Sequence, residues 1–578
     1  MADANVTETT TNVTENDKNP YAYLDREDFT SEKYKIEVRG LPKYYGIGEF
    51  KKLLNEKLEL QLCKVKPPRK GSGWLYVCFR NEECRQRAIT TINGILWKNS
   101  KLTAQVAKPA PDPFVKRKLE EEESNHKRLK TDSNCSPVDK IKFITTPLWN
   151  MPYPNQLELK QKEMKSILIK IGQQMLKESK ALTDWITSQR KLYDGLPCEL
   201  QTILSTDITE AYRNKCEFTI GKDTEQNKVI IGFRLSSYAS GSTAVGPIDD
   251  LCHIPESMKV AVKILETFIR ESNLEPFNPV NHSGYWRQVT ARITRANHLM
   301  LIVGIQAQEL SSDELEKLKS QLRIFFETGK GVDAHVTSLY FQTLDKKSIG
   351  GESNDTLYHI SGTEYIEETL LGMKFQVSPQ AFFQVNTLGA EVLYKAAIGL
   401  AEPTMDTSLL DVCCGTGTIG LCFSKHCGEV LGIEVTPDAI KDAKENAVKN
   451  NITNCEFFVG KAEDILSPVI QRATKSNIIA IVDPPRAGLH QKALLTLRKV
   501  KKLNRLVYIS CDPRAAMRNL VDLARPSSKQ YLGEPLVPVK AIAVDMFPHT
   551  KHCELIMCLE RLSKAMKSNE CTTQENTK

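Results

Sequence analysis

The apolar run 506–509 constrains the fold of this chain most, because it stops abruptly at the polar turn Ser510-Cys511-Asp512-Pro513. Consecutive large apolar residues predict a strand that is buried on both faces, as in a parallel sheet. Pro513 has no backbone N–H to donate, so the strand has to end before it. In an open α/β sheet, ligands bind beyond the carboxyl ends of the strands. We therefore predict an α/β fold with Cys511 as a candidate nucleophile at a strand end.

The length and charge of the chain set broad limits on its organisation. A chain of 578 residues is too long for a single core, so we expect two to four domains. The 78 Lys and Arg residues outnumber 71 Asp and Glu residues, a net charge of +7 that permits a polyanionic partner without requiring one. Neither a signal peptide nor a long apolar segment is apparent, so we expect no membrane association. The 16 cysteines include no C-x-x-C pair, which predicts reduced thiols and no metal site.

The N-terminal part predicts a small domain after a polar leader. Residues 1–31 are rich in Thr, Asn and acidic residues, so we expect disorder. Residues 32–108 predict the order βαββαβ, which resembles an RNA-recognition motif (RRM). Its second predicted strand matches the RNP1 consensus of that family. Trp74 and Tyr76 stand at the two base-stacking positions, and Phe79 stands at the last position of the consensus. Because Glu37 replaces the usual aromatic residue of the first strand, a protein-binding α+β domain is the alternative.

The middle of the chain predicts a linker and a second domain. Residues 109–140 form a charged linker with basic clusters at 116–118 and 127–130. These clusters suit a bipartite nuclear-localisation signal or a solvated spacer, so we expect the protein in the nucleus, the cytosol or both. Residues 141–375 predict a helical segment and then a β-rich central domain. Basic residues on its strands, such as Arg213 and Lys215, by themselves indicate only a solvated face.

A glycine-rich turn at 408–420 predicts a nucleotide site. Gly415, Gly417 and Gly420 follow an apolar strand and open a helix, although this spacing suits a dinucleotide equally well. The next strand ends at Glu434, whose carboxylate can accept both ribose hydroxyls of a nucleoside. The apolar strand 478–482 then ends at Asp483, in the sequence Asp-Pro-Pro-Arg. This ending resembles the fourth motif of class I methyltransferases, which use S-adenosylmethionine.

The residue types at the strand ends narrow the target of methylation. Enzymes that methylate exocyclic amines carry an aromatic residue where this chain has Arg486, and RNA cytosine-C5 enzymes carry a cysteine that is absent here. The remaining common target is C5 of uracil, which needs a thiolate added at C6 before it can attack a methyl group. Cys511 could supply that thiolate. Glu554, at the start of the apolar strand 555–559, could then remove the C5 proton.

Five motifs in this order are similar to those of the RNA uracil-C5 methyltransferase family: 383–386, 415–417, 483–486, 510–513 and 545–554. The resemblance implies a Rossmann-like methyltransferase domain over 376–562 and a central domain that recognises RNA, and we expect a disordered tail over 563–578. It implies Cys511 as the nucleophile, Glu554 as the proton acceptor, and Arg213 and Lys215 as RNA contacts. It further implies that S-adenosylmethionine is contacted by Gln384, Cys413, Gly415, Thr418, Glu434 and Asp483.

We therefore expect methylation of uridine C5 in RNA, most directly of the T-loop uridine at tRNA position 54. Uridines of other RNAs, such as rRNA and mRNA, are alternative substrates. The rival hypothesis is an RNA-binding or RNA-chaperone protein with a weakened methyltransferase domain. It depends on Asp512, which stands where the family usually has Asn. A carboxylate beside Cys511 would disfavour the thiolate unless it points away.

Overall fold

The computed structural model describes residues 32–42, 45–66, 72–109, 136–224, 226–235, 244–279, 281–344 and 355–575, with the backbone alone for 569–575. The chain forms two compact units, Met1–Asn134 and Cys135–Lys578. The basic clusters at 116–118 and 127–130 and the segment 1–31 lie outside the described residues. Among the described residues, no helix has the length and apolar character needed to cross a membrane.

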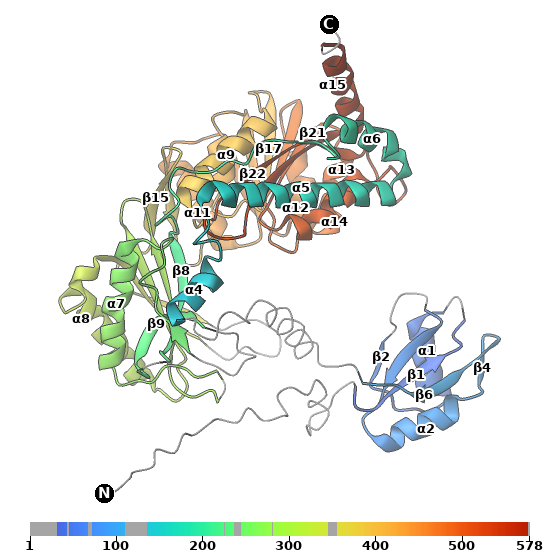
Figure 1. Ribbon diagram of the computed structural model, residues 1–578, viewed down its shortest axis with the longest axis horizontal. Helices are drawn as coiled ribbons and strands as arrows, with labels where there is room; N and C mark the ends of the chain where they lie inside the picture. The colour runs from blue at the N-terminus through green and yellow to red at the C-terminus, as the bar shows by residue number, and fades with distance from the viewer. Residues whose placement is uncertain are drawn as a thin grey trace, which may run out of the picture. The chain divides into compact units, whose positions relative to one another are not determined.

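The N-terminal unit is a four-stranded antiparallel sheet with helices packed on one face (Figure 1). The element order is the predicted βαββαβ with a small hairpin added. The helices cover one face because Ile36, Val38, Leu75 and Val77 alternate toward them along the two central strands. The sheet order is β2 (Lys64–Lys66), β3 (Trp74–Cys78), β1 (Lys35–Arg39), β6 (Thr103–Val106); the helices are α1 (Ile47–Lys52), η3 (Leu53–Lys57) and α2 (Glu82–Ile92); the hairpin is β4 (Leu96–Trp97) with β5 (Ser100–Lys101).

The second unit contains an eight-stranded lobe built on a mostly parallel sheet (Figure 1). From β17 the chain runs outward to one side through β18 and β19, then returns to the other side of β17 for β20 and β21. The crevice for a ligand is expected at this reversal, beyond the carboxyl ends of the strands. The sheet order is β19 (Cys455–Val459), β18 (Glu429–Glu434), β17 (Thr407–Val412), β20 (Asn477–Val482), β21 (Leu503–Ser510), β23 (Glu554–Arg561), β22 (Leu536–Val544), β7 (Glu199–Leu200); β23 is antiparallel to both of its neighbours.

Helices cover both faces of this sheet, so its strands are apolar throughout, as the run 506–509 predicted. One face packs against α9 (Thr387–Ala401), α10 (Thr418–Phe423), α11 (Pro437–Lys449) and the hairpin β15 (Ile366–Leu370) with β16 (Met373–Val377). The other packs against α5 (Tyr153–Glu178), α6 (Thr183–Leu192), α12 (Ala462–Gln471), α13 (Gln491–Lys499) and α14 (Pro513–Ala524).

The domain boundaries differ from those predicted in the helical segment before β8. We assigned α5, η4 (Lys180–Leu182), α6 and β7 to the central domain 141–375, but they belong to the eight-stranded lobe. Helix α5 packs against α14 through Met164, Ile167, Leu168, Ile171 and Met175, and β7 pairs with β22 at the edge of the sheet. The apolar spacing of α5 revealed a buried face, but periodicity cannot say which element covers it.

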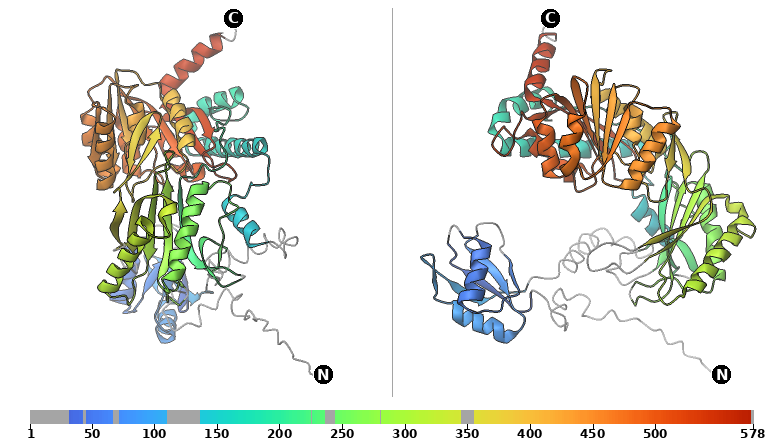
Figure 2. Two further views of the ribbon diagram at one scale, coloured as in Figure 1. Left: turned by 90° about the vertical axis from the view of Figure 1, so that its left-hand side faces the viewer. Right: turned by 180° about the vertical axis from the view of Figure 1, so that it is seen from behind.

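A seven-stranded lobe follows, with α7 and α8 packed on its sheet (Figure 2). It confirms the β-rich character expected of the centre of the chain. Helix α4 (Pro137–Thr145) also packs here through Ile141, so the predicted linker 109–140 overlaps an ordered helix. The sheet order is β10 (Val245–Gly246), β9 (Val229–Arg234), β8 (Lys215–Lys222), β11 (Trp286–Ile293), β12 (Leu299–Ile305), β13 (Val336–Thr343), β14 (Thr356–Gly362); the helices are α7 (Glu256–Glu271), α8 (Ser312–Glu327) and the single turn η6 (Val332–Ala334).

The C-terminal segment 563–578, expected to be disordered, is helical over most of its length. Helix α15 (Leu562–Glu575) starts where β23 ends. Ala565 is buried in the core of the eight-stranded lobe, and Lys564 pairs with Glu560 at 2.9 Å. Leu562 and Ala565, which dock the helix on this core, both lie in its first turn.

Candidate active site

Cys511 and Glu554 lie at one edge of the eight-stranded sheet, on neighbouring strands. Strand β21 ends at Ser510, and the antiparallel strand β23 begins at Glu554. Ser510 pairs with Leu555 in this ladder, so Cys511 and Glu554 occupy the next opposing positions. Asp483 follows directly on the adjacent strand β20, whose Val482 pairs with Tyr508. The structure therefore brings together the three acid and thiol groups that the sequence placed at strand ends.

Glu554 is a buried carboxyl group that retains its proton at neutral pH. Its side chain is 3% exposed, and Oε2 has no hydrogen-bond partner among the described residues. Burial raises the pKa of Glu554 to about 8, and the charge of Asp483 adds to the rise. Burial likewise raises the pKa of Asp483 to about 7. Carboxyl groups with pKa values near neutrality suit general acid–base work.

Arg486 lies beside the Cys511 thiol, a proximity that the sequence did not reveal. Burial raises the pKa of the Cys511 thiol, and the charges of Glu554 and Asp483 raise it further. Arg486 acts in the opposite sense, through its charge and a hydrogen bond to the thiol. We had used Arg486 only to argue against amine chemistry. The available signal was a cation four residues past the end of β20, the strand beside β21.

Asp512 caps a helix. Its carboxylate accepts hydrogen bonds from the backbone N–H groups of Arg514 and Ala515, each at 3.2 Å, at the N-terminus of α14. Asp and Asn are about equally good at this capping position. The carboxylate is thus turned toward the positive end of the helix, which favours its charge. The basis for the rival hypothesis, a carboxylate that disables Cys511, does not hold in this geometry.

The glycine-rich turn after β17 leaves room for a ligand beside the backbone. Gly415 has φ of 54°, and a Cβ added there would meet no atom within 4 Å. Cys413 also has a positive φ, 68°, and its backbone N–H donates to the carbonyl of Ile433 at 2.9 Å. Thr418 begins α10 with its hydroxyl 3.4 Å from that of Tyr394. The turn is therefore anchored to β18 while one side of it stays open.

Glu434, at the end of β18, faces this turn. Its Oε2 accepts from the backbone N–H of Gly415 at 3.2 Å. Two apolar side chains at the same edge remain exposed, Val435 at 53% and Val459 at 48%. A carboxylate for ribose hydroxyls, open space over a glycine and exposed apolar side chains for an adenine ring fit the nucleoside part of S-adenosylmethionine. The sequence identified Glu434 but not the two valines.

Gln384 joins the two lobes of the second unit. It is 7% exposed, and its backbone carbonyl accepts from Asn214 Nδ2 at 2.9 Å. Asn214 stands between Arg213 and Lys215, so both candidate RNA contacts lie beside the Gln384 loop. Lys215 forms an ion pair with Glu217 at 3.0 Å, and Arg213 is half-buried. Phe382 in the same loop is 66% exposed, which is unusual for an aromatic side chain and was not anticipated.

In the N-terminal unit, Trp74 and Tyr76 share the sheet face opposite the helices. Their ring centroids are 5.0 Å apart, and Lys35 Nζ lies 4.4 Å from the Tyr76 ring. Glu37 pairs with Tyr76 across the strands, and its carboxylate binds the Arg39 guanidinium, which offsets its charge. Phe79, at the last position of the RNP1 consensus, is a core residue. Phe79 is 0% exposed, because it alternates with Leu75 and Val77 toward the core.

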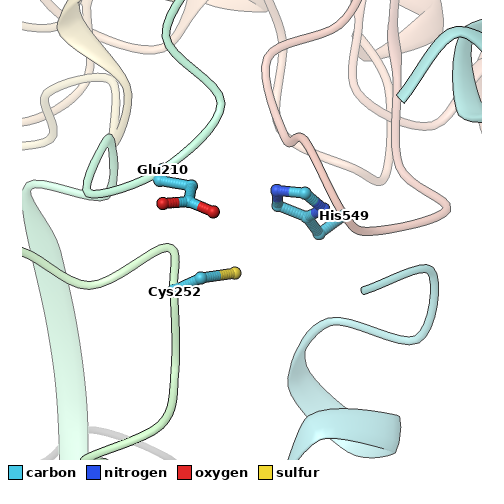
Figure 3. Close-up of side chains that lie close together, drawn as sticks. All are labelled: Glu210, Cys252 and His549. Atoms are coloured by element: carbon cyan, nitrogen blue, oxygen red, sulfur yellow. The ribbon is translucent and has the colours of Figure 1, made fainter. Parts of the chain in front are cut away.

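Glu210, Cys252 and His549 gather where the two lobes of the second unit meet (Figure 3), with ligand-type atoms within 4.8 Å of one another. The orientation of the Gln156 amide decides what this cluster can bind. Gln156 Oε1 accepts from the backbone N–H of His549 at 2.8 Å, and Nε2 lies 3.1 Å from His549 Nδ1. A neutral His549 ring then carries its proton on Nε2, which a metal would need free. We assign no metal to this cluster.

Comparisons with known proteins agree with this geometry. Residues 332–562 match the sequence pattern of the family described as tRNA (uracil-5-)-methyltransferase. The chain is 38% identical over 546 residues to the human tRNA (uracil-5-)-methyltransferase homolog A, covering 94% of this chain and 85% of that protein. It is 37% identical over 452 residues to the human homolog B, covering 76% of this chain and 88% of that protein.

The crystal structure of the Pyrococcus abyssi tRNA (uracil-54, C5)-methyltransferase in complex with S-adenosyl-L-homocysteine has a similar fold, with a TM-score of 0.50 and 23% identity. The similarity covers 71% of this chain and 84% of that one. The sheet order and the nucleoside crevice define a class I methyltransferase. With the sequence identity to homolog A across nearly its whole length, the chain belongs to the tRNA (uracil-5-)-methyltransferase family.

Proposed function

We propose that this protein methylates C5 of a uridine in tRNA, using S-adenosylmethionine and a covalent bond between Cys511 and C6 of the uracil. The observation that carries the proposal is the pairing of Cys511 with Glu554 at adjoining strand ends, beside a crevice that fits a nucleoside. The similarity to the tRNA (uracil-5-)-methyltransferase homologs A and B supports tRNA as the substrate class. Other RNAs with a uridine in a similar loop remain a second candidate.

Each group at the site has a step to perform. The Cys511 thiolate, stabilised by the Arg486 guanidinium, forms a bond to C6 while the C5–C6 π electrons move to O4 and give an enolate. S-adenosylmethionine, when bound, supplies an electrophilic methyl group on a sulfonium. C5 takes that methyl group, and the carboxylate of Glu554 then removes the C5 proton. The C–H electron pair re-forms the C5–C6 double bond, the C6–S bond breaks, and the Cys511 thiolate is released.

The protonation states of Glu554 and Cys511 before the reaction set a requirement for this series of steps. Glu554, with a pKa of about 8, and Cys511, with a raised pKa, both hold a proton at neutral pH. Each must lose that proton before its step. Ionised Glu554 also raises the pKa of the thiol, so a negative charge on one group opposes a negative charge on the other. Arg486 is the nearby cation that relieves this opposition for Cys511.

The target uridine of a folded tRNA loop has to leave its stack to reach Cys511. The Gln384 loop is attached to the loop that precedes Glu554 by the hydrogen bond from Asn386 to Met546, and it presents the exposed ring of Phe382, on which a neighbouring base could stack. Arg213 and Lys215 lie next to that loop, where they would contact the phosphates that flank the uridine. In this proposal the seven-stranded lobe positions the RNA backbone and the eight-stranded lobe performs the chemistry.

The N-terminal unit would add a second RNA contact through the open face of its sheet. Trp74 and Tyr76 supply rings for stacking, and Lys64 supplies positive charge on the same sheet, whereas Lys35 and Lys66 are ion-paired with Glu32. We keep the basic clusters at 116–118 and 127–130 as a candidate nuclear-localisation signal, for a protein active in the nucleus, the cytosol or both.

A tRNA that contains 5-fluorouridine tests the proposal. Fluorine cannot be removed from C5 as a cation, so the covalent complex should persist after methyl transfer and resist denaturation. We expect a protein–RNA adduct with the wild-type chain in the presence of S-adenosylmethionine, and none with Cys511→Ala. Cys455→Ala is the matched control, because Cys455 is a half-buried cysteine at the start of β19, to which no role in binding or catalysis is assigned. Failure to form an adduct, or an adduct that survives Cys511→Ala, would refute the covalent mechanism.

A further inference from the structure

The loop 545–553 joins β22 to β23 and ends at Glu554, and side chains from outside the hairpin hold its first residue. Lys160 of α5 forms an ion pair with Asp545, with Nζ 2.6 Å from Oδ1 and side-chain exposures of 1% and 0%. The hydroxyl of Tyr153 donates to Asp545 Oδ2 at 3.1 Å. Both carboxylate oxygens are therefore held by one helix. Lys160 also donates to the carbonyl of Phe547 at 3.0 Å.

The same helix holds the far side of the loop through Gln156. This side chain accepts from the backbone N–H of His549 and approaches its ring nitrogen Nδ1, at 2.8 and 3.1 Å. Tyr153, Gln156 and Lys160 are spaced by three and four residues, so they form one face of α5. Just before the helix, the backbone N–H of Leu148 donates to the carbonyl of His549 at 2.9 Å. The N-terminal end of α5 is thus docked onto the loop.

Two further residues, from outside α5, form hydrogen bonds to the loop 545–553. Asn386, the N-cap of α9, donates from Nδ2 to the carbonyl of Met546 at 3.0 Å. Tyr212, which precedes β8, donates its hydroxyl to the carbonyl of Pro548 at 3.0 Å. The four consecutive carbonyls of residues 546–549 are therefore each bound from outside the hairpin. Backbone that is bound at every position has little freedom to shift.

The stability of the fold does not account for the buried ion pair. Exchanging such a pair for apolar residues is often neutral or even stabilising, since the cost of desolvating two charges offsets their attraction. What the pair does supply is a fixed geometry at the residue that follows β22. Val544, the last residue of β22, pairs with Glu554 across the mouth of this loop. Among the described residues, Oε2 of Glu554 has no hydrogen-bond partner, so the position of this oxygen depends on where the backbone of Glu554 lies.

We infer that Lys160 and Asp545 are positioning residues for the removal of the C5 proton by Glu554. Helix α5, although it precedes the seven-stranded lobe in the chain, holds the catalytic base in register with Cys511 through the loop 545–553. Proton removal takes the C5 proton onto the Glu554 carboxylate, returns the C–H pair to the C5–C6 bond and releases the Cys511 thiolate. This inference rests on the proposed function and concerns the release of the adduct, not its formation.

The test uses the double variant Lys160→Met with Asp545→Asn, which removes both charges and leaves neither buried alone. With tRNA containing 5-fluorouridine, we expect adduct formation within about twofold of the wild-type rate. With unmodified tRNA, we expect turnover to fall by about tenfold to hundredfold, as for a displaced catalytic group, and the covalent complex to accumulate. Lys165→Met is the control on the same helix, because its ion pair with Asp194 is exposed.

Tyr153→Phe provides a second variant that removes only one hydrogen bond to Asp545. It should fold normally by melting temperature and show the same split between formation and release, to a smaller extent. Wild-type turnover in a folded double variant would overturn the inference. So would an equal loss of adduct formation and of turnover, which would indicate a general structural role. If the wild-type chain itself forms no adduct, the proposed function fails instead.

Discussion

Glu554 lies across the β21–β23 ladder from Cys511, and its charge raises the pKa of the thiol that it has to serve. In the proposed mechanism the two groups act in succession, the thiolate in the first step and the carboxylate in the last. The electrostatic repulsion between Cys511 and Glu554 is strongest when both are ionised and no substrate lies between them. In the proposed mechanism, an uncharged uracil ring between the two groups and the Arg486 guanidinium beside the thiol reduce the repulsion between their negative charges.

The first prediction concerns pH. The pKa of Glu554 is about 8 and that of Cys511 is above its ordinary value, so both reactive forms become populated only as the pH rises. The rate of adduct formation on 5-fluorouridine tRNA should therefore increase from about pH 6 to about pH 9. Rapid-quench measurements across this range would show it. In Glu554→Gln the rise should move to lower pH, since the charge that raises the thiol pKa is gone; a pH-independent rate would contradict the assignment of Cys511 as the nucleophile.

The second prediction concerns Glu554 as the base. Glu554→Gln preserves the shape of the side chain but cannot accept the C5 proton. The variant should bind tRNA and form the bond to C6, then release methylated product at a rate lowered by about a hundredfold or more. Covalent protein–RNA should therefore accumulate on unmodified tRNA and be visible on a denaturing gel. Glu560→Gln, on the same strand and far from the edge at Cys511, serves as the control. Complete loss of the adduct would show that Glu554 acts before this step.

The third prediction concerns Arg486. Arg486→Met removes the cation that lowers the pKa of Cys511, so adduct formation at neutral pH should slow by about tenfold to hundredfold. Raising the pH should restore much of the lost rate, because the thiolate then forms without help. Arg486→Lys keeps the charge and should retain more activity than the methionine variant. A loss that stays constant at every pH would mean that Arg486 acts on the RNA and not on the thiol.

The fourth prediction concerns Asp512. Because its carboxylate accepts two backbone N–H groups of α14, Asp512→Asn should leave both the free energy of unfolding and the turnover close to wild type. Asp512→Ala removes the cap and should cost about 1 kcal/mol of stability. Thermal or denaturant unfolding would measure the difference. Faster turnover in Asp512→Asn, by tenfold or more, would revive the hypothesis that this residue weakens the enzyme.

The fifth prediction concerns the N-terminal unit. Replacing Trp74 and Tyr76 together with Ala removes both rings of the open sheet face and should weaken tRNA binding by about 1–3 kcal/mol per stacked base. Filter binding at a fixed salt concentration would measure this change. Trp97→Ala offers a comparison, because that ring packs against Phe50 and Tyr45 elsewhere in the unit. Unchanged affinity in the double variant would favour a protein partner for this sheet.

The ends of the strands were predictable because their signals are local. An apolar run followed by a polar turn marks a strand end, and parallel strands that end at one edge bring their following residues together. Cys511, Glu434 and Asp483 were found in this way, and the register of β23 then accounts for Glu554. The core position of Phe79 follows from the same alternation that buries Leu75 and Val77.

Features that depend on long-range contacts were not predictable from local signals. The charge of Arg486 could be read from the sequence, but its hydrogen bond to Cys511 depends on the adjacency of β20 and β21. The role of Asp512 as a cap is local and could have been recognised from Pro513 and the helical pattern that follows. The partner of Lys160 lies 385 residues away in the chain, and no pattern in either segment points to the other.

The docking of α5 and β7 onto the eight-stranded sheet has a consequence for how the chain folds. These elements emerge from the ribosome long before β20, β21 and β22, the strands they pack against or pair with, have been made. Their apolar faces stay uncovered while the whole seven-stranded lobe is synthesised, and such surfaces attract chaperones or aggregate. The seven-stranded lobe has its own core and can form in the meantime. The site that contains Cys511 and Glu554 is therefore among the last parts of the molecule to assemble, long after α5 has been synthesised.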